Sequence, residues 1–449
     1  MSKLAIHGGD PVRTKPFPEW PRPTSELKDA IISTLENEGW GVGSKAISRF
    51  EERFADFHDS KYCISTSSGT TALWVALKAA GVKAGDEVIV PPYTFIATAS
   101  AVLMANAVPI FVDIDENTFN IDPDLIEDAI TEKTKVIMPV HIAGNPADMD
   151  RILSIGKKHN ISIIEDAAQA HGAEWHGTKV GALGTGGIFS FQTSKNMSAG
   201  EGGAIISNDE TFYDICFAYH NCGRTKGGAF YEHQFLGGNF RLNAMASSML
   251  IPQINTIQGD MVLRDRNREK LDTVLRQIDG ISINGTYDGT TRQANHIYLV
   301  RYNADSFNGI PREKFYKAMQ AEGVYTYMGY TPLYREKLFV TDGKEYPWLK
   351  NYDFASMKMP VTERLADKEA VWLKQNHLLG DENDTQDIID AFENGIYPIT
   401  KVYCEPQLGK RDLYPKHNSR NTQYSSNDTN KDNSWLINTI LAILSMSDG

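Results

Sequence analysis

The sequence is poor in cysteine and has no long hydrophobic segment. Its 449 residues include four cysteines, with no C-x-x-C pair and no spacing typical of metal ligands. Isolated cysteines in a chain of this length are typical of free thiols in a reducing compartment. The N-terminus lacks the apolar run of a signal peptide, and the longest late apolar stretch, residues 436–444, is too short to span a bilayer. We therefore expect a cytoplasmic protein with no membrane partner and no metal site.

The sequence also has fewer basic residues than acidic ones. Lys and Arg number 45 against 57 Asp and Glu, which gives a net charge of −12. This excess of acid argues against a nucleic-acid partner, which would need a basic face, but it leaves room for a local phosphate pocket. Hydrophobic residues at 41% and charged residues at 23% are typical of a globular protein with a large core.

Short apolar runs alternate with helical patterns between about residues 60 and 210. The helix expected over residues 70–80 is the first of these, and Asp122-Pro123 and Asn145-Pro146 each offer an N-cap followed by proline at the first helical position. The expected strands are 87–90, 108–114, 135–140, 161–164, 187–191 and 203–207. Such alternation predicts an α/β fold with a mostly parallel central sheet covered by helices.

The pattern changes after about Asn243, where a long helical stretch is followed by a smaller α+β region with an expected strand at 296–302. We expect a large domain over residues 1–250, a small C-terminal domain over 251–400 and a polar extension over 401–449. The extension is rich in Asn, Ser, Thr, Asp and Lys, which bury little apolar surface, so it should be poorly ordered. The run 434–444 could form a short amphipathic helix within it.

Two motifs offer contacts for a flat phosphorylated ligand. Ser68-Gly69-Thr70 opens the first expected helix, and glycine at a helix N-terminus lets a phosphate approach the free N–H groups. Tyr93 and Phe95 follow the strand at 87–90, where either ring could stack on a heterocycle. Taken singly, a helix cap and a core aromatic are the commoner interpretations.

Two further motifs carry charge at the ends of expected strands. Asp166 follows a buried run, where a carboxylate needs a cationic partner such as a protonated pyridine nitrogen. Lys195 lies between two apolar strands, and a desolvated lysine has a lowered pKa and can form a Schiff base. Taken singly, the commoner interpretation of Asp166 is a helix N-cap, and that of Lys195 is a solvated surface charge. In chain order, the four motifs supply every contact that pyridoxal phosphate needs.

At these residues the chain resembles the DegT/DnrJ/EryC1/StrS aminotransferases, which are fold-type-I pyridoxal-phosphate enzymes that aminate keto-sugars. The resemblance extends from about Leu4 to about Gly395. The motifs that carry it are GGDPVR, SSGTTAL, GDEVIVPPYTF, TKVIMPVHIAG, EDAAQAHGA, SFQTSKNMSAGEGGAI and LGGNFRLN. The polar tail has no counterpart in the usual family pattern.

The resemblance implies catalytic and cofactor-binding roles for Lys195 and Asp166, and a cofactor-binding role for Gln169. Lys195 in SFQTSK matches the lysine that forms the Schiff base with the cofactor and moves the proton. Asp166 in EDAAQ matches the partner of the pyridine nitrogen, and Gln169 matches the residue that contacts the phenolic oxygen.

The resemblance implies cofactor-binding roles for five more residues. Gly69 and Thr70 match the phosphate-binding turn, and Ser190 matches a hydroxyl that adds a phosphate bond. Phe95 matches the stacking ring. Asn239 in GGNFR matches a residue that reaches the phosphate of the neighbouring subunit's cofactor, which implies a homodimer with shared active sites.

The resemblance also implies a two-step transfer in which L-glutamate or L-glutamine gives its amino group to a nucleotide-linked keto-sugar or to a keto-cyclitol such as scyllo-inosose. GGDPVR and AHGA are most similar to the branch that includes inosose aminotransferases. The alternatives are an activity like that of 3-amino-5-hydroxybenzoate synthase and a non-catalytic regulator. A sugar dehydratase of this fold would have histidine in place of Lys195. His141, His171 and His296 are isolated in the sequence, so we interpret them as core or pocket histidines rather than metal ligands.

Overall fold

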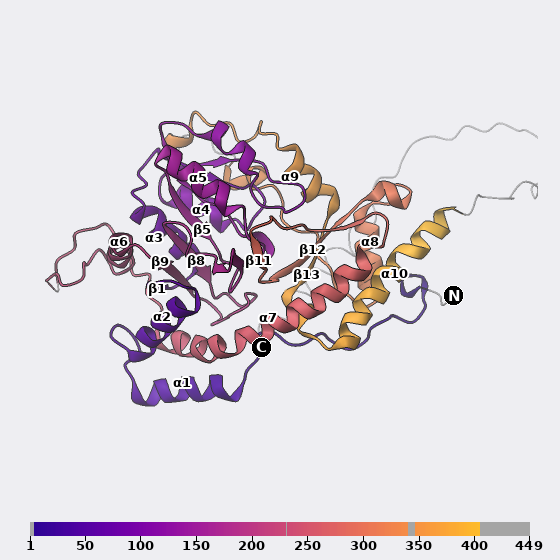
Figure 1. Cartoon of the computed structure of the whole chain (residues 1–449), viewed down its shortest axis with the longest axis horizontal. Helices are drawn as coiled ribbons and strands as arrows, with labels where there is room; N and C mark the ends of the chain where they lie inside the picture. Colours follow the sequence, from indigo (N-terminus) through magenta and orange to yellow (C-terminus); the bar gives the residue numbers. More distant parts are fainter. Residues whose placement is uncertain (1–3, 230, 340–345, 405–449) are drawn as a thin grey trace, which may run out of the picture. The chain divides into compact units, whose positions relative to one another are not determined.

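The computed structural model describes residues 4–229, 231–339 and 346–404 (Figure 1). The residues up to Cys404 form one compact unit. Residues 405–449 lie outside the described part of the chain, so the expectations about the polar extension and the run 434–444 stay predictions. Within the described residues, no helix is long and apolar enough to cross a lipid bilayer.

Seven strands of the described chain form the central sheet, in the order β1-β9-β8-β5-β4-β2-β3. β9 pairs antiparallel with both β1 and β8, whereas the pairs from β8 through β5, β4 and β2 to β3 are parallel. The strands are β1 Tyr62–Thr66, β2 Glu87–Val90, β3 Val108–Phe111, β4 Thr134–Ile137, β5 Ser162–Asp166, β8 Gly186–Ser190 and β9 Gly203–Ser207. The predicted α/β class and mostly parallel sheet are confirmed.

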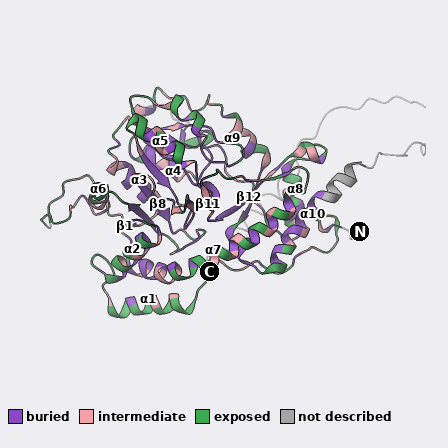
Figure 2. Ribbon diagram, in the orientation of Figure 1, coloured by how far each residue is buried: buried purple, intermediate pink, exposed green. Residues whose placement is uncertain are grey.

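Helices cover both faces of this sheet, and alternate strand residues face the two layers. On β2, Ile89 packs in one apolar cluster, whereas Val88 and Val90 pack in the other. Figure 2 shows the central strands buried and the outer sides of many helices exposed. α2 Lys45–Phe57, α5 Met149–His159 and the first half of α7 Ala244–Leu275 contribute to the first cluster. α3 Gly69–Ala79, α4 Ala97–Met104 and α6 Glu210–His220 contribute to the second.

A second, antiparallel sheet has its own apolar core. It consists of β10 Ile281–Ile283, β12 Ile297–Tyr302 and β13 Ala370–Lys374, so the strand expected at 296–302 is confirmed. α8 Arg312–Ala321, α10 Glu382–Cys404 and the second half of α7 enclose this core. α7 passes position 250 without a break. Arg13, near the N-terminus, pairs with Asp384 and Asp387 at 2.8 and 2.7 Å, so the N-terminal segment is attached to the first turns of α10.

The remaining elements are short. α1 Ser25–Asn37 lies against α7, and α9 Pro360–Arg364 precedes a π-helical turn at Leu365–Glu369. β6 Glu174–Trp175, β7 Thr178–Lys179 and β11 Thr290–Arg292 form a small third sheet. The 3-10 helices are Ala5–His7, Pro123–Leu125, Glu127–Ala129, Ile142–Gly144, Ala304–Phe307, Leu333–Arg335, Lys337–Phe339, Pro347–Leu349 and Gln375–Leu379.

One of the two predicted helix starts is wrong and the other is only partly right. Asp122 caps a helix that begins at a proline, but that helix is a 3-10 turn and not an α-helix. No α-helix begins at Pro146, because α5 begins at Met149 with Asp148 as its cap. The Asn145 side chain is buried and donates to the Gly285 carbonyl at 2.9 Å, so it makes a tertiary contact instead of a cap.

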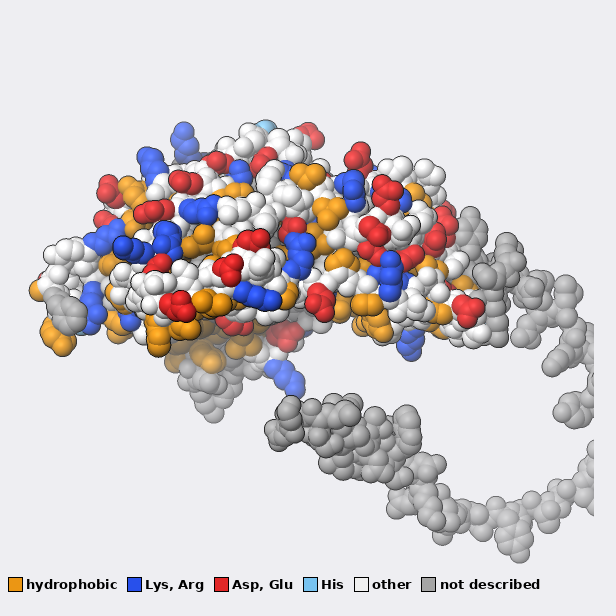
Figure 3. Space-filling model, turned by 90° about the horizontal axis from the view of Figure 1, so that it is seen from below, with side chains coloured by type: hydrophobic (Ala, Val, Ile, Leu, Met, Phe, Trp, Pro, Cys, Tyr) orange, Lys and Arg blue, Asp and Glu red, His pale blue; other side chains and the backbone are white. Residues whose placement is uncertain are grey.

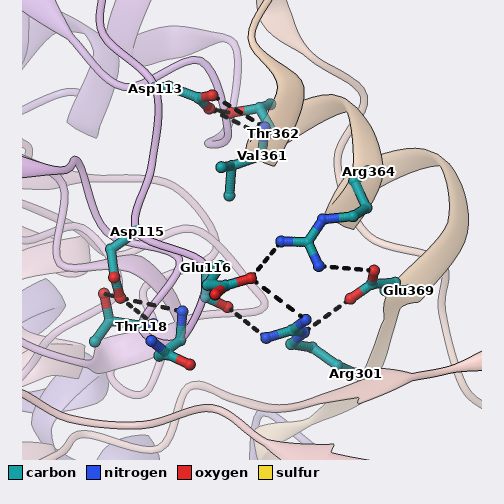
Figure 4. A network of polar contacts seen from close by, with 10 residues as sticks. Asp113, Asp115, Glu116, Thr118, Arg301, Val361, Thr362, Arg364 and Glu369 are labelled. Carbon is teal, nitrogen blue, oxygen red and sulfur yellow. Dashed lines mark hydrogen bonds and ion pairs between the residues drawn. The ribbon is translucent and has the colours of Figure 1, made fainter. Parts of the chain in front are cut away.

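A polar network joins the loop after β3 to the second sheet and α9 (Figure 4). The buried carboxylate of Asp113 accepts hydrogen bonds from the backbone N–H groups of Val361 and Thr362 at 3.0 and 2.9 Å, and from the Thr362 hydroxyl at 2.6 Å. Beside it, four partly exposed side chains alternate in charge: Glu116, Arg301, Glu369 and Arg364. The network fixes α9 relative to the central sheet.

Candidate active site

A cavity of about 1080 Å³ opens where the central strands end. Parallel sheets gather their ligands at this edge. Residues from the second sheet complete its wall, among them His296, Trp372 and Lys374. Seven of the predicted site residues line the cavity: Gly69, Thr70, Phe95, Asp166, Gln169, Ser190 and Lys195.

The N-terminus of α3 forms one end of the cavity. Ser68 caps it by accepting a hydrogen bond from the Thr71 N–H at 3.1 Å, and the first N–H groups of a helix have no partner within it. A Cβ on Gly69 would lie 2.8 Å from the Cβ of Ser190, so glycine is needed for α3 to approach the end of β8. Ser190 accepts from the Gln192 N–H at 3.3 Å, which leaves its own hydrogen available to a ligand. These groups suit a phosphate.

Asp166 ends β5 and is buried, with 4% of its surface exposed. Its oxygens accept hydrogen bonds from the Thr98 hydroxyl at 2.8 Å and the Ala168 N–H at 3.2 Å. Burial raises the pKa of Asp166, although these two hydrogen bonds and the charge of Lys195 oppose that change. Within the described residues it forms no ion pair, so a cationic ring nitrogen would fit the site electrostatically.

Lys195 is on the loop after β8, is half-buried and lines the cavity. Burial lowers the pKa of Lys195 to about 8, and the nearby Asp166 carboxylate limits the fall. The indole N–H of Trp20 donates to the Lys195 carbonyl oxygen at 2.8 Å and so holds its backbone. A lysine with this pKa is neutral far more often at neutral pH than an ordinary lysine, and only the neutral amine is a nucleophile.

Gln169 has a fixed orientation in the cavity. Its carbonyl oxygen accepts from the Ala143 N–H at 2.8 Å, so its NH₂ group faces the Tyr330 hydroxyl, 3.2 Å away. Burial raises the pKa of Tyr330, which therefore stays protonated. Together these two side chains present donors toward the cavity.

Two of the predicted site residues, Phe95 and Asn239, are exposed to solvent. Phe95 is 53% exposed although it lines the cavity, so its ring is open to a ligand. Asn239 does not line the cavity; it is exposed and forms a backbone bridge with Asn221.

Several residues that line the cavity were not predicted from the sequence. Thr98 lies three positions after Phe95, and its capacity to donate to Asp166 could have been inferred from helical spacing. No local sequence pattern marks Trp20, Tyr330 or Trp372 as cavity residues, and none shows that His296 contacts the cavity. These residues reach the cavity only through packing of the second sheet and the N-terminal segment.

Comparison with known proteins defines the class. The sequence profile of the DegT/DnrJ/EryC1/StrS aminotransferase family matches residues 22–393. A protein of Streptoalloteichus tenebrarius that carries the provisional name L-glutamine:3-amino-2,3-dideoxy-scyllo-inosose aminotransferase is 38% identical over 403 residues, which cover 87% of this chain and 97% of that protein. The L-glutamine:2-deoxy-scyllo-inosose aminotransferase of Streptomyces kanamyceticus is 37% identical over 412 residues, with 87% and 96% covered.

The fold agrees with a solved structure. The crystal structure of 3-amino-5-hydroxybenzoic acid synthase matches with a TM-score of 0.77 and 31% identity, covering 86% of this chain and all of that one. The fold and the matches define a fold-type-I aminotransferase. More narrowly, the chain belongs to the DegT/DnrJ/EryC1/StrS aminotransferase family.

Proposed function

We propose that this enzyme uses pyridoxal phosphate to transfer the amino group of L-glutamine to the ketone of a keto-cyclitol. The observation that carries the proposal is the pairing of the half-buried Lys195 with the buried Asp166 in one cavity at the carboxyl edge of the sheet. The substrates are inferred from relatives at 37–38% identity that are named for L-glutamine and inososes. The 3-amino-5-hydroxybenzoic acid synthase, at 31% identity, gives weaker support to an aromatic product.

Residues at the two ends of the cavity fit the cofactor. The N-terminus of α3 at Gly69 and Thr70, with the Ser190 hydroxyl, would hold its phosphate. Asp166 would keep the ring nitrogen protonated, and the exposed ring of Phe95 would stack on the pyridine. When bound, pyridoxal phosphate supplies an electron sink for the carbon that loses its proton.

Lys195 would then perform two tasks in turn. In the resting enzyme its amine would hold the cofactor. Once an amino substrate displaces it, the free amine, with a pKa of about 8, can accept the proton from the donor's α-carbon and return it at the next step. Gln169 and Tyr330 would orient the oxygen on the ring by donating hydrogen bonds to it.

We further infer a homodimer in which Asn239 reaches the partner's site. The loop after α6 extends away from the central sheet (Figure 1) and exposes 83% of Tyr231 and 92% of Leu236. Figure 3 shows hydrophobic side chains at the end of the molecule that this loop forms. On α1 and the loop after it, Ile32, Leu35, Trp40 and Val42 are also exposed. Large exposed apolar side chains in such number are typical of an interface.

The test uses purified protein reconstituted with pyridoxal phosphate. We expect L-glutamine and 2-deoxy-scyllo-inosose to yield an aminated cyclitol by mass spectrometry, with L-glutamate a poorer donor and Lys195→Ala inactive. Turnover of a nucleotide-linked keto-sugar in preference to the cyclitol would overturn the substrate assignment. Loss of water from an amino-substituted cyclic ketone, to give an aromatic amine, would favour the alternative.

A further inference from the structure

His296 is a cavity residue to which the proposed chemistry gives no task. It lies directly before β12, is 7% exposed and lines the same cavity as Lys195. Its Nδ1 lies 3.1 Å from the side-chain oxygen of Asn196, the residue that follows Lys195. Its Nε2 has no hydrogen-bond partner within the described residues.

Asn196 determines which ring nitrogen carries the hydrogen. The Asn196 side-chain NH₂ donates to the Ala294 carbonyl at 2.7 Å, so its other atom, the oxygen, faces His296. An oxygen requires a donor, and Nδ1 is therefore protonated. In a neutral imidazole the other nitrogen is then an acceptor.

The ring stays neutral because of its surroundings. Burial lowers the pKa of His296 well below its ordinary value, and the charges of Lys195 and Arg264, with His171 nearby, lower it further. A protonated ring would place a second cation beside Lys195. Nε2 is consequently a hydrogen-bond acceptor and a poor base at neutral pH.

A donor lies across the sheet from this acceptor. β12 and β13 are antiparallel with Ile297 opposite Lys374, and the next pair in this register is His296 and Gln375. Gln375 also lines the cavity; its oxygen accepts from Arg264 at 3.1 Å, and its buried amide nitrogen has no partner. This end of the cavity therefore presents an acceptor beside an unused donor.

We propose that Nε2 of His296 binds substrate by accepting a hydrogen bond from a neutral O–H or N–H group, with Gln375 beside it. A cyclitol hydroxyl and the carboxamide of L-glutamine share this chemistry. A carboxylate has no hydrogen to offer and would meet the lone pair of Nε2, so the residue disfavours L-glutamate as donor. The inference rests on the proposed function for the identity of the two substrates.

The experiment compares His296→Phe, which keeps a ring but removes the acceptor, with His296→Gln, whose amide oxygen can accept. His377→Phe is the matched control: this histidine is also buried near β13 but does not line the cavity. Each protein is checked for its melting temperature and for the visible absorbance of the bound cofactor. The two half-reactions are then followed separately, one with L-glutamine and one with 2-deoxy-scyllo-inosose, together with equilibrium binding of scyllo-inositol by calorimetry.

We expect His296→Phe to raise the KM of at least one substrate about tenfold or more, with His296→Gln closer to wild type and His377→Phe unchanged. An effect confined to the cyclitol half-reaction, with weaker scyllo-inositol binding, assigns the contact to a hydroxyl. An effect confined to L-glutamine assigns it to the carboxamide. Values within about twofold of wild type for both substrates would overturn the inference.

Failure of the proposed function gives a different result. If wild-type enzyme catalyses neither half-reaction, the function is wrong, and equilibrium binding of scyllo-inositol and L-glutamine to wild type and His296→Phe still decides the inference. Binding of either that weakens in the Phe variant supports it. Binding that is absent from wild type, or equal in the two proteins, contradicts it.

Discussion

Lys195 and Asp166 influence each other's charge in a cavity that disfavours both charges. Burial lowers the pKa of the lysine and raises that of the carboxylate, while the attraction between them opposes each change. Thr98 stabilises the anionic form of Asp166 by donating to it at 2.8 Å. The result is a lysine that can be neutral near pH 8 beside a carboxylate held by hydrogen bonds.

The first prediction concerns the identity of the reactive lysine. Lys195→Ala should remove the visible absorbance of the bound cofactor and lower transamination by more than the roughly 10²–10⁴-fold of acid–base catalysis alone. Lys195→Arg should be nearly as inactive, because a guanidinium stays protonated and forms no imine. Borohydride reduction and peptide mapping should place the label on Lys195. A label on Lys374, which also lines the cavity, would contradict the assignment.

The second prediction concerns the pH dependence of cofactor loading. Only the neutral amine of Lys195 can attack the aldehyde, so the loading rate of apoprotein should rise with pH and level off above about pH 8, the pKa of this lysine. Asp166→Asn removes the charge that raises this pKa, so its midpoint should lie at lower pH. Stopped-flow absorbance measures both. A midpoint near the ordinary lysine value of about 10.4, or a shift to higher pH in the Asn variant, would contradict the prediction.

Elements that the sequence predicted well are those with continuous apolar runs. β2 and β9 have the expected bounds, and β3 ends three residues earlier than expected because its pairing with β2 stops at Phe111 and Ile114 bridges Ile121 instead. A buried parallel strand needs apolar residues on both faces, and the sequence records this directly. The helix expected after Asn145 failed because a capping residue type was engaged in a distant contact.

The residues of the candidate site likewise fall into a group that the sequence predicted and a group that it did not. Residues on the loops after central strands were predicted, since those loops meet at one edge of the sheet. The part of the wall formed by Tyr330 and Trp372 was not, and His296 was expected only as a core or pocket histidine, because this part depends on how the second sheet packs on the first. Sequence spacing does not encode that packing.

The third prediction concerns the contact between the central sheet and α9 (Figure 4). Asp113→Asn keeps the shape of the side chain but turns an NH₂ group toward the donors of Val361 or Thr362, so the free energy of unfolding should fall by about 1–3 kcal/mol. The control is Glu116→Gln, in the exposed part of the same network, which should change it by less than about 1 kcal/mol. Urea denaturation of both variants measures the difference. Equal effects would show that Asp113 has no special role.

At the scale of the whole molecule, the proposed shared-site dimer would account for the position of Asn239. This residue is exposed and lies outside the cavity of its own chain, on the loop that carries the exposed Tyr231 and Leu236. An isologous dimer would place the loop of each chain at the partner's cavity. In that arrangement each site takes its lysine from one chain and Asn239 from the other.

The last prediction follows from the proposed sharing of each site between two chains. Lys195→Ala should be inactive, and Asn239→Asp should bind the cofactor weakly because a carboxylate repels its phosphate. After the two variants are mixed, unfolded and refolded together in equal amounts, half of the dimers should be mixed. Each mixed dimer has one site with both native residues, so activity should return to about a quarter of wild type. If Asn239 acts within its own chain, or if the protein is a monomer, mixing restores nothing. Recovery that disappears when the variants are refolded apart and then combined briefly would show that chain exchange is required.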